Sequence, residues 1–544
     1  EVNYNLSKLM MSLEVSVPLL ANSTKLGFGF SNRGGIKNAD IVIIRSMEDQ
    51  IFIDDCWCNK NGEVRRDVEQ NYNLIRYSKI NNYVWQIDIE RSFDTCDDHD
   101  YQLDSGTTNI IVIYPIHSPC KSIHINLVDC NISKVPVTLR RAQLLKPEVT
   151  VPKTHAKWFD IVAPNVTIPR SSTTYWCNLQ QLPPFKRKVH GVGFAGVISN
   201  PDLVHHIEVY LCDIDDLEIP SYNGICNAKQ MPVQLTRCNH VLAAWAFGAE
   251  AFYYPKEAGL AFDSATMSPY VRLEIHYNNP HHLVGRVDHS GIRFYYTEQL
   301  RQYDVGILET GVTYSPNMAV PPHQTSFEWA GICPASCTRA AIPPSGINIF
   351  ASELHTHLLG RKAQTTLLRS DGSSEVIERD RHYSTWFEEI RYVTPVISVK
   401  PGDSLITTCA FDSIKKKNVT LGGLGLQDEM CVGYLHYYPV SQLEVCKSSV
   451  SRIALEAFFK LISLLSGKPT NIRPHNLHQN YNEITWGPAA ARSLQALYRD
   501  SPVDVKCLRG NGKEWGGKWD NVRSTIPYSE AVSSQDVPNE RCGV

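Results

Sequence analysis

Short runs of β-branched and aromatic residues, separated by turns rich in Gly, Pro, Asn and Asp, make up most of the chain. They include IVIIRS (41–46), NIIVIYPI (109–116), HHIEVYLC (205–212), YVRLEIHYNN (270–279) and SLITTCAF (404–411). Val, Ile, Tyr, Phe and Thr favour extended backbone, and clustered turn residues end one strand before the next begins. Strands at this spacing form sandwiches or jelly rolls rather than alternating βαβ units. The sequence therefore predicts a mainly β protein.

The length of the chain requires more than one domain, because a single hydrophobic core stops growing well below 544 residues. Prolines and charges in LRRAQLLKPEVTVPK (139–153) predict a boundary near residue 146. We expect a first unit at 1–146, a second at 150–305, a third at 306–446 and a C-terminal extension at 447–544.

The extension differs in character from the rest of the chain. Its segments 449–467 and 488–501 carry apolar residues at helical spacing, with Ser451 as an expected N-cap and Gly467 as an expected stop. We expect the core-facing side chains to be Ile453, Leu455, Phe458, Phe459, Ile462 and Leu465 in the first helix, and Ala490, Leu494, Leu497 and Tyr498 in the second.

Charge and hydropathy exclude some classes of partner. The net charge of −3 and the pI near 6.7 give no reason to expect a nucleic-acid partner. No uninterrupted apolar run reaches the roughly 18–20 residues that a spanning helix requires. The chain begins at Glu1 without an initiator Met, so we expect that a signal or anchor segment has been removed.

Cysteine usage indicates the compartment. Sixteen cysteines, mostly placed singly, are many for a cytosolic protein and ordinary for a secretory one. N-glycosylation sequons point the same way and occur at Asn5, Asn22, Asn131, Asn165 and Asn418. The sequence therefore predicts residence in the secretory pathway, in a secretory or synaptic vesicle lumen or outside the cell.

ASELHTHLLGRK (351–362) places His355 and His357 one residue apart in a strand-like run. Alternate side chains of a strand share a face, so both imidazoles point the same way. A pair of surface or core histidines is the commoner explanation of an isolated His-x-His. The metal explanation needs a third ligand.

Three more histidines lie in two other predicted strands. His205 and His206 are adjacent, so an ideal strand would turn them to opposite faces, and joint ligation requires a bulge or a twist. In RLEIHYNNP (272–280), His276 follows Arg272 and Glu274 on the polar side of an alternating strand. Three neutral imidazoles brought together would suit copper or zinc.

Met430 helps to distinguish copper from zinc as the expected metal. It lies in LGGLGLQDEMCVGYLHYYP (421–439), and a single Met is usually a core-filling residue. A thioether beside His355 and His357 would instead make a His2Met site, which suits Cu(I) and scarcely suits zinc. Two sites of unequal softness indicate redox copper with divided roles.

Several long stretches resemble one family in the same order along the chain. They are LVHHIEVYLC (203–212), CNHVLAAWAFGAEAFYYPKEAGLAF (238–262), RLEIHYNNP, PPSGINIFASELHTHLLGRK (343–362), HYSTWFEEIR (382–391) and DEMCVGYLHYYP (428–439). They are similar to the copper type II ascorbate-dependent monooxygenases, in the branch of the dopamine and tyramine β-hydroxylases. The likeness is dense from about 150 to 446 and weaker to the C-terminus. Upstream, GFGFSNRGGIKNADIVII (27–44) looks like a DOMON domain.

The resemblance implies a fold. An N-terminal DOMON β-sandwich would precede two jelly-roll-like β-sandwich catalytic domains and a short helical extension, which is a candidate dimerisation region. It also implies two copper ions per chain. The electron-transfer copper would be bound by His205, His206 and His276, and the oxygen-activating copper by His355, His357 and Met430.

The implied reaction is hydroxylation of the β (benzylic) carbon of a phenylethylamine, with O2 as co-substrate and ascorbate as electron donor. The substrate would be tyramine or dopamine, and no sequence feature distinguishes the two. Tyr434 matches the family's tyrosine near the second copper, and its ordinary alternative is aromatic packing with Tyr437 and Tyr438. Glu353 and Glu250 are candidates for holding the substrate amine, although either is equally explained as a solvated carboxylate.

The resemblance also implies disulfides. Its pairs are Cys177–Cys226, Cys212–Cys238, Cys409–Cys431, Cys333–Cys446, Cys337–Cys507 and Cys96–Cys542, with Cys120–Cys130 as a candidate for a further short loop. Cys56 and Cys58 have no evident partner.

Two departures from the family pattern stand out. No cysteines for an inter-subunit bridge occur around SGKPTNIRPHN (466–476), so we expect any homo-oligomer to lack a covalent bridge there. The family's DOMON metal site would use Asp40 and the backbone oxygens of Ile41 and Cys56, but its last carboxylate falls on Asn71, which weakens or removes that site.

Three alternatives stay open. A peptidylglycine-type amidating monooxygenase is disfavoured by the DOMON-like domain and the C-terminal extension. A catalytically silent secreted copper-binding β-protein would use the same ligands for structure or for copper carriage. A zinc hydrolase would use the imidazoles without a role for Met430.

Overall fold

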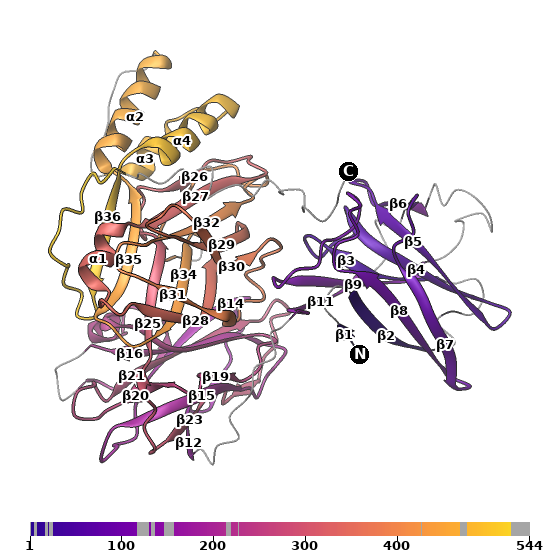
Figure 1. The fold of residues 1–544 in the computed structure, drawn as a ribbon, viewed down its shortest axis with the longest axis horizontal. Helices are drawn as coiled ribbons and strands as arrows, with labels where there is room; N and C mark the ends of the chain where they lie inside the picture. The colour runs from indigo at the N-terminus through magenta and orange to yellow at the C-terminus, as the bar shows by residue number, and fades with distance from the viewer. Residues whose placement is uncertain are drawn as a thin grey trace. The chain divides into compact units, whose positions relative to one another are not determined.

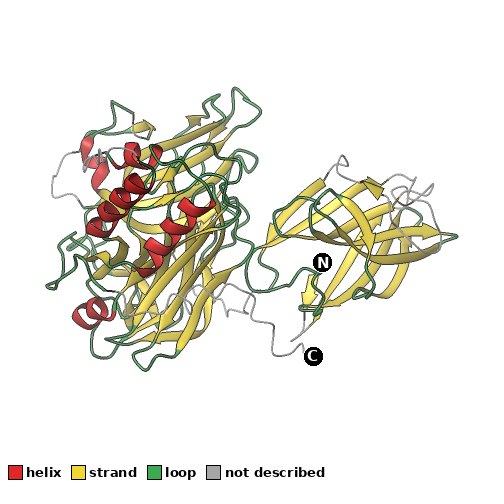
Figure 2. Ribbon diagram, turned by 90° about the horizontal axis from the view of Figure 1, so that it is seen from above, coloured by secondary structure: helices red, strands yellow, loops and turns green. Residues whose placement is uncertain are grey.

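The computed structural model describes residues 2–4, 8–16, 20, 25–116, 130–131, 137–145, 157–213, 219–226, 228–425, 427–467 and 476–523. These residues form two compact units (Figure 1). Unit 1 comprises the described residues up to 145 and the short segment 380–383. Unit 2 comprises the described residues from 157 onward apart from that segment. Strands and loops make up nearly all of both units (Figure 2), which confirms the predicted mainly β fold.

Unit 1 is a sandwich of two sheets. The first has the order β1 (Val2–Tyr4), β2 (Lys8–Ser16), β8 (Val84–Ser92) and β7 (Asn73–Asn81). The second has the order β10 (Cys130–Asn131), β6 (Glu63–Arg66), β5 (Gln50–Cys58), β4 (Ala39–Met47), β3 (Lys25–Ser31), β9 (Thr108–Ile116) and β11 (Val137–Ala142). The predicted strand 41–46 lies in β4. Its run is almost wholly apolar because Val42 and Ile44 enter the inter-sheet core while Ile41 and Ile43 pack into a second cluster.

The first half of unit 2 contains two main sheets. One has the order β12 (Lys157–Val162), β23 (Gly291–Thr297), β15 (Val189–Val197), β20 (Ala258–Phe262) and β24 (Tyr303–Asp304), with β19 (Phe252–Tyr253) also paired to β15. The other has the order β17 (Asn223–Ile225), β14 (Thr173–Gln181), β21 (Tyr270–Asn278), β16 (Val204–Cys212) and β18 (Cys238–Ala246). A small pair is formed by β13 (Val166–Thr167) and β22 (Val287–Asp288), and a 3-10 helix spans Val233–Arg237.

The second half of unit 2 is also built from two main sheets. The larger has the order β31 (Arg391–Val399), β28 (Ile347–Thr356), β34 (Cys431–Tyr438), β25 (Gly306–Val312), β35 (Leu443–Val450) and β36 (Val503–Arg509). The smaller has the order β27 (Phe327–Cys333), β32 (Ser404–Phe411), β29 (Gly360–Leu368) and β30 (Ser374–Asp380). β26 (Ala319–Val320) pairs with β33 (Thr420–Leu421). The expected boundaries near 146, 305 and 446 stay predictions.

The two halves of unit 2 share a hydrophobic core. Phe252 and Tyr254 from the first half belong to the same buried cluster as Phe350 and Ala351 from the second. His240 Nδ1 lies 2.7 Å from Glu444 Oε2 across the same junction. Burying aromatic side chains at a junction contributes about 1.5–3 kcal/mol each. The halves are therefore packed against each other, which fixes the polar faces that they present to one another.

Four helices occur among the described residues, and three of them gather at one end of unit 2 (Figure 1). They are α2 (Arg452–Leu465), α3 (Leu477–Asn482) and α4 (Pro488–Asp500); α1 (Ala335–Ala341) follows β27. The expected cap is present, since Ser451 Oγ accepts a hydrogen bond from Ala454 N at 3.2 Å. None of these helices is long and apolar enough to cross a bilayer, and α2, with 14 residues, is the longest.

Two expectations about the extension are wrong. Ile453 and Leu465 are 69% and 74% exposed rather than core-facing. α2 buries only the stripe of Leu455, Phe458 and Phe459, and residues off that i, i+3, i+4 stripe point to solvent. In α4 the buried residues are Ala491, Leu494 and Tyr498, so the expected positions at Ala490 and Leu497 are only partly buried.

The extension also supplies a strand that no pattern predicted. β36 adds to the edge of the sheet that contains β28 and β34 by pairing with β35. Its partner lies more than fifty residues away in sequence, and a strand at such a distance leaves no local signal.

Candidate metal centres

Three histidines meet on the polar face of one sheet. His206 on β16 pairs directly with His276 on β21, and the register shifts between Val204 and His206. This irregularity is the bulge that two adjacent histidines require, because the extra residue turns His205 to the side of His206. One ring nitrogen from each of the three lies within 4.8 Å of the other two. The geometry matches a three-imidazole metal site.

Burial and neighbouring charges keep His206 and His276 neutral. Burial first, and then the charge of His205, lowers the pKa of His276 to about 3. Burial, then the charges of the neighbouring histidines, holds the pKa of His206 well below its usual value. His276 Nε2 lies 2.7 Å from Thr173 Oγ1, whereas its Nδ1 is buried without a hydrogen-bond partner. A buried nitrogen with a free lone pair fits a metal ion, since only neutral imidazole ligates.

The second ligand set is assembled across two strands. β28 and β34 pair antiparallel with His355 opposite Val432 and Thr356 opposite Cys431. Continuing that register brings Met430 opposite His357. Directly opposed residues share a face, and residues two apart on a strand do so as well. His355, His357 and Met430 therefore lie on one face. Met430 is 7% exposed.

That face points out of its own sandwich. Cys431 on the other face is bonded to Cys409 of β32, and a Cβ on Gly433 would meet the hydroxyls of Thr365, Thr310 and Thr407. Cys431 and Gly433 thus point into the sandwich, and Met430, Val432 and Tyr434 point away from it. The second ligand set consequently faces the first half of unit 2.

Hydrogen bonds hold both histidines of the second set. His355 Nδ1 lies 3.2 Å from Glu388 Oε2, and His357 Nδ1 lies 3.0 Å from the backbone oxygen of Asp428. A metal-binding histidine characteristically donates its other N–H to a carboxylate or a carbonyl, which fixes the ring and the tautomer. Each imidazole thus leaves Nε2 for a metal. The set of two imidazoles and one thioether suits Cu(I).

Glu429 connects the turn after His357 to the segment that carries Met430 and leads into β34. It is 1% exposed, and its carboxylate accepts from His357 N at 3.0 Å and from Leu359 N at 2.6 Å. Burial raises the pKa of Glu429 to about 7, against the effect of these backbone donors. This carboxylate therefore fixes the position of His357 relative to Met430.

The two histidines of the second set differ electrostatically. Burial lowers the pKa of His357 to about 4, assisted by the charge of His355. Burial alone would also lower the pKa of His355, but the charge and hydrogen bond of Glu388 raise it to about 9. In the metal-free protein His355 therefore carries a proton that a metal ion would displace.

Tyr434 lies in a row of polar residues beside the second set. It is paired with Glu353 on β28 and with Glu309 on β25. Its hydroxyl is 3.5 Å from that of Tyr314, which donates to Glu309. Lys447 Nζ in turn donates to Glu309 at 2.6 Å. Tyr434 thus belongs to a hydrogen-bonded network on the face that carries the second set, and its role there stays a prediction.

One segment reaches both ligand sets. Residues 384–390 follow β30, and from this segment Trp386 packs edge-on against His205 with ring centroids 4.8 Å apart. Two residues later Glu388 contacts His355. The stretch HYSTWFEEIR contains these residues, but its spacing gives no indication of either contact.

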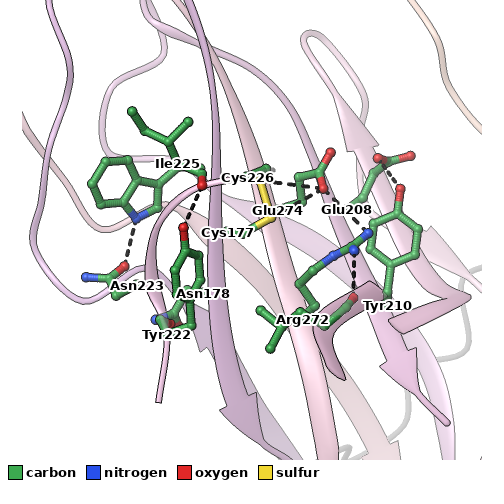
Figure 3. Close-up of a disulfide and its surroundings, with 12 residues drawn as sticks. Cys177, Asn178, Glu208, Tyr210, Tyr222, Asn223, Ile225, Cys226, Arg272 and Glu274 are labelled. Atoms are coloured by element: carbon green, nitrogen blue, oxygen red, sulfur yellow. Dashed lines mark hydrogen bonds and ion pairs between the residues drawn. A yellow bond between two sulfur atoms is a disulfide. The ribbon is translucent and has the colours of Figure 1, made fainter. Parts of the chain in front are cut away.

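Polar side chains of the two halves come close together beside the two sets, and we call the region that they line the cleft. Its first wall is the polar side of β16 and β21, where Glu208, Arg272 and Glu274 lie beside the disulfide Cys177–Cys226 (Figure 3). Tyr210 donates to Glu208 at 2.5 Å, and Arg272 lies 3.5 Å from Glu274. The opposite wall carries the row of Glu353 and Tyr434. The charge of Glu208 acts on Glu353, on Tyr434 and on His355, so the walls lie close together.

Other clusters of metal-binding side chains in the described chain differ from these two sets in their ligands. Cys177 and Cys226 lie near Glu274, and Cys333, Cys337 and Cys446 lie near each other, but all these cysteines are in disulfides. In unit 1, Asp40, Asp55 and Asp100 come together. Asp40 accepts from Arg91, from Tyr72 Oη and from Tyr101 N, and Asn71 N donates to Asp55 at 2.7 Å. The weakening of the DOMON metal site stays a prediction.

Five of the implied disulfides are present among the described residues: Cys177–Cys226, Cys212–Cys238, Cys333–Cys446, Cys337–Cys507 and Cys409–Cys431. Cys96 is disulfide-bonded, but Cys542 lies outside the described residues, as does Cys120, the candidate partner of Cys130. Cys56 and Cys58 are buried free thiols. This number of disulfides indicates an oxidising compartment.

The sequons are only partly within the described chain. Asn165 and Asn418 are exposed in turns, where a glycan has room. Asn131 lies in β10, and Asn5 and Asn22 lie outside the described residues. Glycosylation at all five stays a prediction.

Family models match the chain in three places. Residues 159–284 match the copper type II ascorbate-dependent monooxygenase N-terminal domain, residues 303–459 match its C-terminal domain, and residues 1–117 match the DOMON domain. With the two ligand sets in place, these matches show that the chain belongs to the copper type II ascorbate-dependent monooxygenases. It is an enzyme of that type, and copper and ascorbate are what its family depends on.

Individual relatives cover nearly the whole chain. It is 39% identical to the dopamine beta-hydroxylase of Bos taurus, over 100% of this chain and 88% of the relative. It is 34% identical to the tyramine beta-hydroxylase of Caenorhabditis briggsae, over 91% and 85%. It is 32% identical to the DBH-like monooxygenase protein 1 of Homo sapiens, over 90% and 81%. The expected family and branch are thereby confirmed.

Proposed function

We propose that this enzyme hydroxylates the β (benzylic) carbon of a phenylethylamine, tyramine or dopamine, with O2 and ascorbate. One arrangement supports the proposal: three imidazoles converge on one sheet, and two further imidazoles share a face with a thioether on another. His205, His206 and His276 would hold the electron-transfer copper, and His355, His357 and Met430 the oxygen-activating copper. The relatives named as dopamine and tyramine β-hydroxylases support an amine substrate.

When bound, copper supplies one-electron redox chemistry toward ascorbate and oxygen. The protein's own residues prepare the sites for it. Thr173 and Glu388 each fix the ring of one ligand, at His276 and His355. The thioether of Met430 would favour the reduced copper ion.

Tyr434 is proposed to contact the substrate beside the second ligand set. Its ring lies on the ligand face, two residues from Val432, and its hydroxyl is held near Tyr314. Tyr434→Phe keeps the ring and removes the hydroxyl. We expect a lower kcat with both copper ions retained, whereas an unchanged rate would leave Tyr434 with packing alone.

The side chains of the cleft argue against the alternative functions. A zinc hydrolase would have no use for a buried thioether beside two imidazoles, and a silent copper carrier would not need two sets facing each other. An amidating enzyme acts on a peptide that ends in a carboxylate, and we place such a substrate second because the second wall carries Glu353 and Glu309 beside Tyr434.

The deciding experiment is oxygen consumption by the copper-loaded protein with ascorbate. Tyramine, dopamine and a glycine-extended peptide are compared, and the hydroxylated product is identified by mass spectrometry. We expect uptake coupled to product with the amines alone. Full zinc occupancy with no ascorbate-dependent uptake would overturn the proposal, and turnover of the peptide alone would replace it with amidation.

Two further points belong to the proposal. The disulfides and the exposed sequons favour a secretory vesicle lumen or the extracellular space.

The extension stays a candidate dimerisation region, because Ile453, Leu461, Leu464 and Leu465 of α2 are between 54% and 76% exposed. Light scattering of the protein and of Leu464→Glu measures this, and a monomeric wild type would end the idea.

A further inference from the structure

The carboxylates of the cleft differ in whether a hydrogen-bond donor or a cation lies beside them. On the first wall, Glu208 accepts from Tyr210 at 2.5 Å, and Glu274 lies 3.5 Å from a guanidinium nitrogen of Arg272. On the second wall, Glu309 accepts from Lys447 at 2.6 Å. Glu388 lies 3.2 Å from His355. Four acidic side chains thus have a donor or a cation beside them.

Glu353 is the exception. Its carboxylate makes no hydrogen bond and no ion pair with any residue of the described chain, although it is only partly exposed. A carboxyl group that is held away from bulk water without a partner is stabilised either by a proton or by a cation that joins it. A cationic ligand can therefore pair with Glu353 without displacing any partner within the described chain.

The position of Glu353 suits the cation of the proposed substrate. It lies two residues before His355 on the same strand face, which is about 7 Å along the strand. It is directly opposite Tyr434, whose ring offers an aromatic surface. In a phenylethylamine the ammonium nitrogen is one carbon beyond the benzylic carbon. An ammonium at Glu353 would therefore leave the benzylic carbon toward His355.

We infer that Glu353 is the residue that binds the substrate ammonium and so makes the enzyme specific for amines. This inference rests on the proposed function and assigns its substrate-recognition residue. Glu250, the other carboxylate that the sequence offers, is exposed in the loop after β18. A hydrogen bond to a charged group contributes about 1.5–3 kcal/mol, and this corresponds to roughly tenfold to hundredfold in affinity.

The test compares an amine with its neutral analogue. Calorimetric titration of the anaerobic, copper-loaded protein gives Kd for tyramine and for 4-hydroxyphenethyl alcohol, which differ only in the charged group. We expect wild type to prefer the amine and E353Q to lose roughly tenfold to hundredfold in tyramine affinity, with alcohol binding unchanged. E250Q is the matched control and should behave as wild type. Copper content and circular dichroism verify that E353Q keeps its sites and its fold.

Each possible outcome of this test supports or overturns the inference. Retention of the amine preference by E353Q overturns the inference, and so does its loss in E208Q but not in E353Q. If E353Q does not fold, E353D decides, because it keeps the charge but withdraws it by one methylene: a reduced preference supports the inference and an unchanged one overturns it. Wild-type protein that hydroxylates neither amine would overturn the proposed function instead, whatever the variants bind.

Discussion

The two ligand sets of unit 2 are built in different ways. The first lies within a single sheet, where a bulge on β16 turns two adjacent histidines toward a third on the neighbouring strand. The second joins a strand to residues beyond its partner strand's end, and it depends on the turn after His357 and on the buried carboxylate of Glu429. The first is fixed by sheet pairing, and the second by side-chain hydrogen bonds. The second set should therefore be the easier one to perturb.

Removal of the thioether should give the largest effect. Met430→Ile keeps the volume and the apolar character, but it leaves the second set with two ligands. We expect a loss of activity greater than about a hundredfold, because even indirect partners of a metal cost 10–100-fold. Copper content should fall from two to one per chain, and electron paramagnetic resonance should retain only the three-imidazole signal.

Met11→Ile is the matched control, since Met11 is 2% exposed in unit 1 and far from either ligand set in sequence. It should keep both copper ions. Unaltered hydroxylation by Met430→Ile would refute the second set.

The disulfides next to each set provide a second test. Cys409 and Cys431 close a separation of 22 residues beside Met430, and Cys212 and Cys238 close one of 26 residues on the sheet of the first set. Replacing either pair with alanine should reduce the free energy of unfolding by about 3 kcal/mol. Only the Cys409–Cys431 variant should also weaken copper binding at the second set, as a competitive chelator would measure. Equal effects on both sets would remove the contrast.

Glu388→Gln should have a moderate effect that is confined to the second set. The amide is less basic than the carboxylate, so His355 becomes a weaker ligand, and we expect about tenfold lower copper affinity there. The first set should be unchanged. Glu375→Gln is a suitable control, because that carboxylate pairs with Arg369 elsewhere on the same half.

The smallest effect concerns the junction that holds the two sets face to face. The hydrogen bond to Glu444 raises the pKa of His240 despite burial. A raised folded-state pKa means that the pair stabilises below about pH 6.5, the unfolded value, and that this contribution is lost as pH rises through the folded value. Because the partners are 26% and 39% exposed, it is worth only about 0.5 kcal/mol. Urea unfolding of wild type and His240→Gln should differ at pH 5.5 and converge at pH 8.5, and a constant difference would exclude the pair as its cause.

Local sequence patterns predicted much of this architecture. Alternation and turn residues predicted the strands at 205–212, 270–279 and 404–411, which are β16, β21 and β32. The adjacency of His205 and His206 predicted the bulge, since no straight strand can bring both to one side. These features depend on neighbours in sequence, and such neighbours are visible in a single chain.

What could not be predicted depends on pairing across long separations. Met430 comes opposite His357 only because β28 and β34 are adjacent in a particular register, and spacing alone cannot specify a register. The contacts of Trp386 with His205 and of Glu388 with His355 could not be predicted, because they depend on the path of the segment after β30 in the folded chain. The absence of a partner for Glu353 is a property of all its surroundings, so no local motif could reveal it.

The edge strand β36 has a consequence for the order in which the protein matures. The sheets of the first half use strands that end at Asp304, so they can form soon after that residue is synthesised. The sheet that carries His355 is completed by residues 503–509, and Cys337 finds its partner only at Cys507. At 5–20 residues per second, translation separates these events by on the order of 10–40 s. During that interval the second half exposes an unpaired strand edge and a reactive thiol, and nascent chains should depend on chaperones and disulfide isomerases most strongly then.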